Sequence, residues 1–316
     1  IGPVSYLLLG KEKEEGFHRI DLIQKIIPVY FEILTALQKE GAEYIQIDEP
    51  FLALNLTTKE RNAITFVYNE INTFFPSLKV ILTNYFDCFG DNLATVLELP
   101  VHTLHLDLVR CPSQLDDILE SGKLKDNVKL SLGIVDGRNI WKNDFKKSLE
   151  LIQKATDALG HDRILIAPSC SLIHSPCDLD LETNDAVLTP EIKQWLAFAK
   201  QKLDEIVLLQ NLALEEISQV DSVSFLQNTL ANENRKTSKL IHNEEVKYRV
   251  ASIKCGDDQR ENAFNIRRKK QIEALQLPLF PTTTIGSFPQ TNEVRSWRAK
   301  FKKGELSAQE YNDLLE

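Results

Sequence analysis

The sequence predicts an α/β fold in which a parallel sheet belongs to an incomplete (β/α)8 TIM barrel. Three observations predict it. Short runs rich in leucine and β-branched residues recur, the stretches between them are long enough for crossover helices, and the runs are apolar almost throughout. Parallel strands covered on both faces have this composition. A regular strand and helix alternation at this spacing favours a barrel over an open sheet.

Six runs are predicted as strands, at residues 3–10, 43–50, 79–86, 103–109, 129–137 and 164–172. A helical region is predicted for residues 21–39, where Pro28 marks a kink or a second helix start and Gly41 ends the helix. A complete barrel has eight strand and helix units. We therefore expect two further units before Ile1, so that the runs present are strands 3 to 8 of that barrel.

The pattern changes after Thr189. Residues 189–214 predict a long amphipathic helix with Pro190 in its first turn. Residues 215–277 are polar and highly charged, with helical patterns and no strand signal, and predict a helical linker. The stretch "PLFPTTTIGSFP" then predicts a new strand, and Ser307 with Glu310 forms a capping box for a helix. We expect three parts: residues 1–214 as the incomplete barrel, 215–277 as the linker and 278–316 as the first unit of a second barrel.

Composition limits the classes of partner. The chain has 316 residues, with 37 basic and 46 acidic side chains and a formal net charge of −9. This charge argues against nucleic acid or an anionic membrane as the main partner, although it is compatible with a local basic pocket. No apolar run is long enough for a membrane helix, and the first residues lack a basic lead and a cleavage site, so we expect a cytoplasmic protein. The five cysteines form no disulfide framework or C-x-x-C pair, which predicts reduced thiols.

The carboxyl ends of barrel strands are where chemistry is expected. "IDEP" places Asp48 and Glu49 there, pointing to opposite faces of the strand or straddling its end. A general base or metal ligand and a carboxylate that caps the next loop are equally good interpretations. Asp107 and Asp136 occupy similar positions and are more often structural than reactive.

The stretch "PSCSLIHSPC" offers Cys170 and His174 as metal ligands or as a nucleophile and base. The spacing matches no closed zinc pattern, so a buried thiol and a structural histidine are favoured. In "TTTIGSFP", Gly286 lies where a strand would end and Ser287 follows it. Glycine lets a ligand approach the backbone, but a tight turn needs glycine equally.

Several of these stretches together resemble the cobalamin-independent methionine synthases. "YIQIDEPFL", "GIVDGRNIW", "APSCSLIHSP" and "HNEEVKYRVASI" are similar to successive landmarks of that family's N-terminal barrel and linker, and "FPTTTIGSFPQTNEVR" to the opening of its catalytic barrel. The resemblance implies a two-barrel methyltransferase that moves the methyl group of 5-methyltetrahydrofolate polyglutamate to homocysteine without cobalamin. It also implies a role in methionine biosynthesis.

The resemblance implies the site residues as well. In the family, a zinc ion held by His, Cys, Glu and Cys of the C-terminal barrel activates the homocysteine thiol, and those ligands would lie beyond Glu316. Ile285, Gly286 and Ser287 resemble the segment that contacts the amino-acid end of homocysteine or methionine. The other candidate residues become scaffold, no catalytic or metal-binding residue is assigned, and residues 1–316 alone are expected to be inactive.

Two other functions remain open. One is a stand-alone metal-dependent lyase or hydrolase that uses Asp48, Glu49 and His174. The other is a non-catalytic barrel that binds the folate tail or docks on a partner domain. The main expectation has homocysteine, 5-methyltetrahydropteroyltriglutamate and the remainder of its own chain as partners, and neither nucleic acid nor a membrane.

Overall fold

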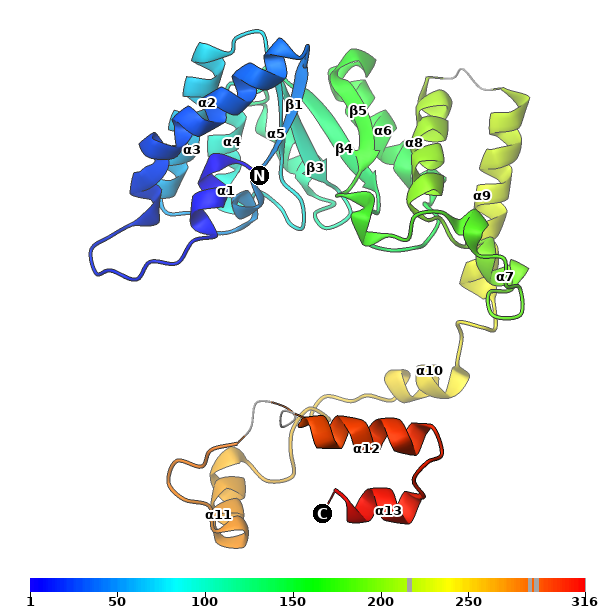
Figure 1. Ribbon diagram of the computed structural model, residues 1–316. Helices are drawn as coiled ribbons and strands as arrows, with labels where there is room; N and C mark the ends of the chain where they lie inside the picture. Colours follow the sequence, from blue (N-terminus) through cyan, green and yellow to red (C-terminus); the bar gives the residue numbers. More distant parts are fainter. Residues whose placement is uncertain (215–217, 284–285, 287–289, 316) are drawn as a thin grey trace. The chain divides into compact units, whose positions relative to one another are not determined.

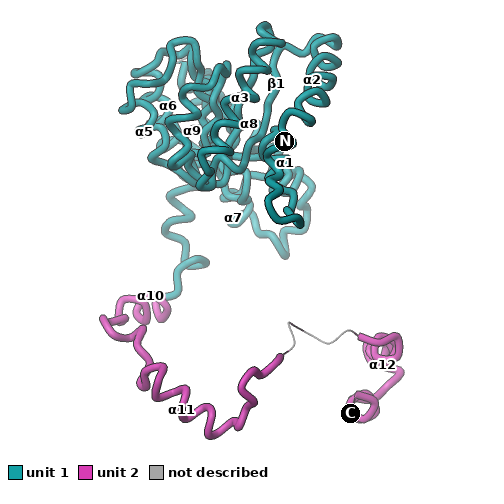
Figure 2. The backbone as a smooth tube through the Cα atoms, turned by 90° about the vertical axis from the view of Figure 1, so that its left-hand side faces the viewer, with its two compact units in different colours: residues 1–243 teal, residues 244–316 magenta. Residues whose placement is uncertain are grey.

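A computed structural model describes residues 1–214, 218–283, 286 and 290–315. The chain divides into two compact units, residues 1–243 and 244–316, shown in two colours in Figure 2. The first unit is an α/β domain and the second contains helices (Figure 1). In the described ranges, no helix combines the length and the apolar character needed to cross a membrane.

The first unit is built on a parallel sheet whose strands lie in chain order, β1-β2-β3-β4-β5. The strands are β1 (Tyr44–Asp48), β2 (Lys79–Thr83), β3 (Thr103–Asp107), β4 (Lys129–Val135) and β5 (Ile164–Pro168). These are five of the six predicted strands, and they confirm the α/β class with a parallel sheet. All of their carboxyl ends lie at one edge, where the candidate residues were expected to meet.

Helices follow the strands along the chain. Those of the first unit are α1 (Pro3–Leu8), α2 (Ile23–Lys39), α3 (Thr58–Phe74), α4 (Leu93–Glu98), α5 (Gln114–Ser121), α6 (Phe145–Leu159), α7 (Pro190–Lys193), α8 (Ala199–Ala213) and α9 (Gln219–Thr237). The second unit has α10 (Glu244–Ala251), α11 (Phe264–Leu275), α12 (Asn292–Lys302) and α13 (Ala308–Asp313). In Figure 1, α6 and α8 lie beside β4 and β5, against which they pack.

The two faces of the sheet differ in polarity. Side chains of one parity belong to the main hydrophobic core: Ile47, Val80, Leu82, Leu104, Leu106, Leu130 and Leu132. Side chains of the other parity line a cavity of 470 Å³ and include Gln46, Asp48, Thr83, His105 and Ser131. Alternation of this kind follows from the two-residue period of a strand. The strands are therefore less uniformly apolar than the sequence pattern suggested.

The predicted strand at residues 3–10 is wrong, because Pro3–Leu8 forms helix α1. Pro3 stands in the first turn, where proline is favoured, and Val4, Leu7 and Leu8 repeat at helical spacing on the buried side. A short apolar run fits a buried helix as well as a strand. The backbone amide of Gly2 donates a hydrogen bond to the Asp48 carbonyl (2.6 Å), so the segment still lies at the end of β1.

The long helix predicted for residues 189–214 is interrupted. Helix α7 ends at Lys193 and α8 begins at Ala199, and four of the five residues between them, Trp195 to Phe198, are buried. Trp141 and Leu196 form an antiparallel bridge, with flanking hydrogen bonds from Lys142 to Trp195 (2.8 Å) and from Ala197 to Ile140 (2.9 Å). Pairing with the loop after β4 stabilises the break. Helix α2, by contrast, continues through Pro28.

The second unit has helices in residues 244–275 and two more after residue 291. Helix α13 begins with the predicted capping box, because Ser307 and Glu310 each bond the other's backbone amide. No strand is present in residues 278–283, which corrects part of the expected strand. Gly286 has a backbone φ of 129°, a conformation that favours glycine. Ile285 and Ser287 lie outside the described residues.

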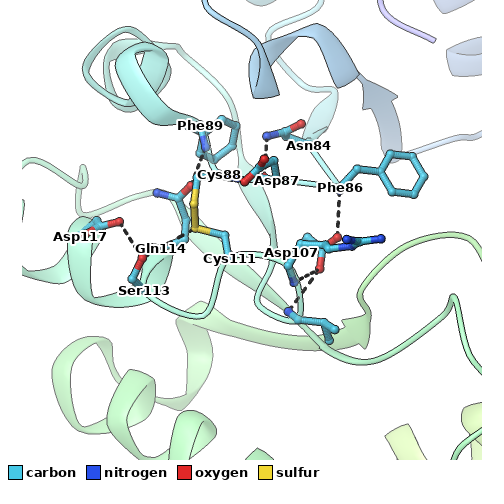
Figure 3. The surroundings of a disulfide bond; sticks show 12 residues. Asn84, Phe86, Asp87, Cys88, Phe89, Asp107, Cys111, Ser113, Gln114 and Asp117 are labelled. Carbon is cyan, nitrogen blue, oxygen red and sulfur yellow. Dashed lines mark hydrogen bonds between the residues drawn. A yellow bond between two sulfur atoms is a disulfide. The ribbon is translucent and has the colours of Figure 1, made fainter. Parts of the chain in front are cut away.

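A disulfide joins Cys88 and Cys111, which corrects the expectation of five reduced thiols. It connects the loops that follow β2 and β3 (Figure 3), and its Cα atoms are 5.2 Å apart. Beside it, Phe89 donates its backbone N–H to the Gln114 side chain (2.7 Å). The sequence contains no signal for this pairing, because the two cysteines are 23 residues apart and meet only through the sheet.

We predict that Cys88→Ser lowers the free energy of unfolding of the first unit by about 3 kcal/mol, since the crosslink restricts the unfolded chain over a loop of this length. Urea unfolding under non-reducing conditions measures the change. Cys255→Ser, which removes an exposed free thiol of the second unit, is the matched control. Thiol titration of the unfolded, unreduced protein should count three reactive thiols, and a count of five would contradict the disulfide.

Candidate functional site

The carboxyl edge of the sheet gathers most of the predicted residues. Asp48 ends β1, Asp107 ends β3, and Arg138 and Cys170 follow β4 and β5. A cavity on the polar face of the sheet reaches this edge and is lined by Asp48, Tyr85 and Cys170 among others. We call Asp48, Tyr85, Phe86, Asp107 and Arg138 the carboxyl-edge cluster.

Asp107 is the most highly bonded residue of this cluster. Arg138 pairs with it through both terminal nitrogens, at 2.6 and 3.1 Å. Backbone amides of Phe86 (2.9 Å), Val109 (3.2 Å) and Arg110 (3.0 Å) also donate to its carboxylate. Although burial opposes the charged form, these bonds hold the pKa of Asp107 below its usual value. Asp107 is a fully occupied anchor for three loops, and it has no free oxygen for chemistry.

Within the carboxyl-edge cluster, Phe86 has a rare backbone conformation. Its backbone φ is 86°, a value that residues other than glycine seldom adopt. Figure 3 shows its amide directed at Asp107. Its ring lies 5.3 Å from the Arg138 guanidinium carbon and 6.1 Å from the His174 ring. The carboxylate of Asp107 thus stabilises a strained loop residue that covers the arginine.

Asp48 faces the polar cavity, where it accepts hydrogen bonds from Tyr85 (2.9 Å) and Gln46 (2.7 Å). Burial, and then the contact with Asp48, raise the pKa of Tyr85 to about 12. A tyrosine of this kind remains protonated at neutral pH and continues to donate. The hydrogen bond between them fixes both side chains in the wall of the cavity.

Glu49 points away from Asp48, to the opposite face of the strand. This is one of the two orientations that the sequence allowed. Its side chain is fully buried, and Ser5 of helix α1 donates a backbone amide to one carboxylate oxygen (2.7 Å). The other oxygen has no hydrogen-bond partner among the described residues. Burial raises the pKa of Glu49 to about 7. A Cβ on Gly2 would come within 2.1 Å of that oxygen, so the carboxyl group requires glycine there.

Asp136 serves a turn after β4. Its carboxylate accepts bonds from the Arg138 backbone (2.8 Å) and from the Asn139 side chain (2.7 Å). Both are local bonds of the kind that stabilise an Asx turn. Its carboxylate also lies 3.9 Å from the Arg138 side chain, so these contacts favour the structural interpretation of Asp136.

Cys170 and His174 do not form a reactive pair. Cys170 is buried, and its sulfur contacts the Ser171 carbonyl at 3.7 Å. Burial raises the pKa of its thiol, which disfavours the nucleophilic thiolate. His174 is exposed and contacts the ring of Phe86. Cys177 is an exposed free thiol.

His105 was missed by the sequence analysis. It lies on β3 with its ring buried, hydrogen-bonded to the Ser131 hydroxyl (2.9 Å) and the Ser169 carbonyl (3.3 Å). Burial lowers its pKa, so the ring is neutral at neutral pH. The available signal was a polar residue at alternate positions within "TLHLD", matched by Ser131 on the next strand. This pair joins two strands across the polar face.

The family resemblance implies zinc, and the described residues do not fit it. Within the parts of the chain that the structure describes, no three His, Cys, Asp or Glu side chains lie together in a way that could hold a metal ion. Asp48, Glu49 and His174 are directed to the cavity, to helix α1 and to the ring of Phe86 respectively. We therefore derive no chemical step through a metal from these residues.

Two sequence families match the chain. Residues 1–160 match the cobalamin-independent synthase, N-terminal domain, and residues 280–316 match the cobalamin-independent synthase, catalytic domain. The first match alone spans more than half of the 316 residues. The chain belongs to the cobalamin-independent synthase family.

Two curated relatives agree with this assignment. A 5-methyltetrahydropteroyltriglutamate–homocysteine methyltransferase of Flavobacterium johnsoniae is 75% identical over 316 residues, and one of Cytophaga hutchinsonii is 55% identical over 315 residues. Each alignment covers 100% of this chain and 41% of the relative. The chain thus spans about two fifths of the length of these relatives. A crystal structure described as a putative vitamin-B12 independent methionine synthase of Listeria monocytogenes is 12% identical, with a TM-score of 0.43 over 63% of this chain and 56% of that chain.

We predict that Glu49 makes the protein less stable as pH rises from about 4.5 to about 7. Its folded pKa of about 7 lies above the ordinary value of 4.5, so the folded state binds the proton more tightly. Stability from this group is greatest below pH 4.5, falls through that window and is level above it. Glu49→Gln should remove about 3 kcal/mol of the fall.

Urea unfolding at a series of pH values tests this. Burial also raises the pKa of Glu205 to about 7, so the Glu49→Gln variant should retain a smaller total fall in stability of the same sign, which comes from Glu205. Gln keeps the shape and the bond from Ser5 but cannot ionise. Equal pH dependence of stability in wild type and Glu49→Gln would show that the buried carboxyl does not titrate in this way.

Proposed function

We propose that this chain is part of a methyltransferase that moves the methyl group of 5-methyltetrahydropteroyltriglutamate to homocysteine and forms methionine without cobalamin. One observation carries the proposal: the two ends of the chain match the N-terminal and catalytic domains of one synthase family, in that order. The names of the relatives add the two substrates. Residues 1–316 alone are proposed to be inactive.

The proposed architecture is a two-barrel enzyme. Residues 1–214 would contribute to the N-terminal (β/α)8 barrel, 215–277 would form a helical linker, and 278–316 would begin the catalytic barrel. Among the strands that the structure describes, β1 pairs only with β2, and this supports the first part. A groove of 580 Å³ beside the free edge includes exposed apolar side chains of α2 such as Val29, Ile33 and Leu37. A further strand and helix of the same barrel would cover this groove.

The proposed chemistry lies outside residues 1–316. Zinc held by the catalytic barrel would lower the thiol pKa of homocysteine and so supply the attacking thiolate. Ile285, Gly286 and Ser287 would contact the amino-acid end of homocysteine. The backbone φ of 129° at Gly286 supports a special role for glycine there, whether in a turn or in close approach to the substrate.

The proposed cellular site is the cytoplasm, where the Cys88–Cys111 disulfide would meet thiol reductants. The alternative of a stand-alone lyase or hydrolase is not favoured. Asp48 is hydrogen-bonded to Tyr85 and Gln46, Glu49 is buried against helix α1, and His174 is exposed. These three side chains do not converge on one point.

Methionine formation from homocysteine and the methylated folate tests the proposal. A longer protein with the length of the relatives should be active, and residues 1–316 should not. In the longer protein, Ser287→Ala should weaken homocysteine binding about ten- to a hundred-fold, because a hydrogen bond to a charged group contributes roughly 1.5–3 kcal/mol. Gly286→Val should weaken it further, since a branched side chain enters the substrate space.

Folate affinity and zinc content serve as the controls, and both should change little in the two variants. Unchanged homocysteine affinity in both variants would mean that Gly286 only forms a turn. Methionine formation by residues 1–316, in material free of the longer enzyme, would contradict the proposed division of labour.

A further inference from the structure

A second cavity, of 530 Å³, lies within the first unit beside the loop that follows β4. Its walls come from that loop, from the start of α6 and from α9, with Ile241 contributing at one side. It shares Asp136 with the turn described above, but Asp48, Tyr85 and Cys170 do not line it. We call it the loop cavity.

The wall formed by residues 139–143 is rigidly built. Buried Lys202 donates its ammonium group to the Trp141 carbonyl (3.0 Å), and the bridge to Leu196 holds the same residue from the other side. Asn143 donates to the Ile134 carbonyl (2.9 Å) through its side chain and to Glu205 (2.9 Å) through its backbone. Such a wall keeps its side chains in place before any ligand arrives.

Helix α9 completes the cavity through buried polar contacts. Asn228 and Asn232 both donate side-chain N–H groups to the Asn143 carbonyl, at 2.8 and 3.1 Å. Arg235, one turn further along, lays its guanidinium over the Trp141 ring, with 3.6 Å between its central carbon and the ring centroid. Arg235 is thereby oriented by a fixed indole ring.

The loop cavity is positively charged in a protein of net charge −9. Lys142, Lys147, Arg235 and Lys236 line it, against Asp136 and Asp144. Lys236 is paired with Glu233 (2.9 Å) and Asp136 is bonded to Arg138 and Asn139. Among the described residues, the side-chain cations of Lys142 and Arg235 make no hydrogen bond or ion pair.

Leaving two partly buried cations without anionic partners is unfavourable. Burial lowers the pKa of both Lys142 and Arg235, although the charge of Glu205 opposes the shift at Lys142. A buried cation has lost part of its hydration. An anion that entered the cavity would replace that lost interaction with water. A guanidinium on an indole ring retains its outward N–H groups for two oxygens of one acid group.

We propose that the loop cavity binds a multivalent anion whose carboxylate or phosphate oxygens bridge Lys142 and Arg235. Such a ligand places one acid group on the guanidinium and another near the lysine. Lys147 at the rim extends the positive field toward further charges. Chains of γ-linked glutamates and polyphosphates both have this chemistry.

Isothermal titration at low salt tests the proposal with two probes, tri-γ-glutamate and inorganic tripolyphosphate. We expect at least one probe to bind residues 1–316 in a one-to-one ratio, and to bind more weakly as salt is raised. Binding of the first alone identifies a carboxylate chain, and binding of the second alone identifies a phosphate chain. Either result supports the shared chemistry.

Two variants locate the site. Arg235→Gln and Lys142→Gln should each weaken binding at least about ten-fold, because each removes a charge-assisted contact. Lys25→Gln, an exposed lysine of α2 outside the cavity, should bind as the wild type does. Thermal unfolding confirms that each variant folds. Equal affinity in all four proteins would place the anion elsewhere, as an adventitious ion only, and absence of saturable binding by both probes would overturn the proposal.

Discussion

Asp107 is the constraint on which the carboxyl edge of the sheet depends. One carboxylate accepts five hydrogen bonds, from the loop after β2, from its own loop after β3 and from Arg138 after β4. The side chain is completely buried, so the group is stable as an anion only because these donors replace water. Three loops that could otherwise move independently share this one anchor.

The other features of this edge follow from the anchor. Phe86 keeps a positive φ because its amide is directed at Asp107, and its ring then covers Arg138. The Cys88–Cys111 disulfide joins two of the same loops a few residues further on. The charged groups of Asp107 and Arg138 thus bond to each other and to loop backbone, and their role is to hold the loops together. In the described part of the loop cavity, by contrast, the side-chain cations of Lys142 and Arg235 have no hydrogen bond or ion pair, and Arg235 lies over the ring of Trp141.

Sequence reasoning predicted the fold well where local pattern and environment agree. Five strands were found because each is a short apolar run between helices, and the capping box at Ser307 is a local signal. The strand prediction for residues 3–10 was wrong because a short apolar run fits a helix equally well, and Pro3 favours a helix start. The break at Trp195–Phe198 was missed because its backbone partners lie more than fifty residues earlier, after β4.

The candidate site was harder to predict, because the chemistry of a side chain depends on neighbours brought by the sheet. "IDEP" allowed Asp48 and Glu49 to point to opposite faces of the strand or to straddle its end, but it did not indicate that Glu49 would be buried against helix α1. Arg138 gave no sequence signal as the partner of Asp107, 31 residues away.

The most direct test of the structural role of Asp107 is to measure unfolding free energy and kcat for Asp107→Asn in the longer enzyme. We expect the variant to lose about 3–5 kcal/mol of unfolding free energy, as when a buried ion pair is broken, with kcat per folded molecule within about two-fold of wild type. A hundred-fold fall in kcat with stability intact would show that the carboxyl edge reacts.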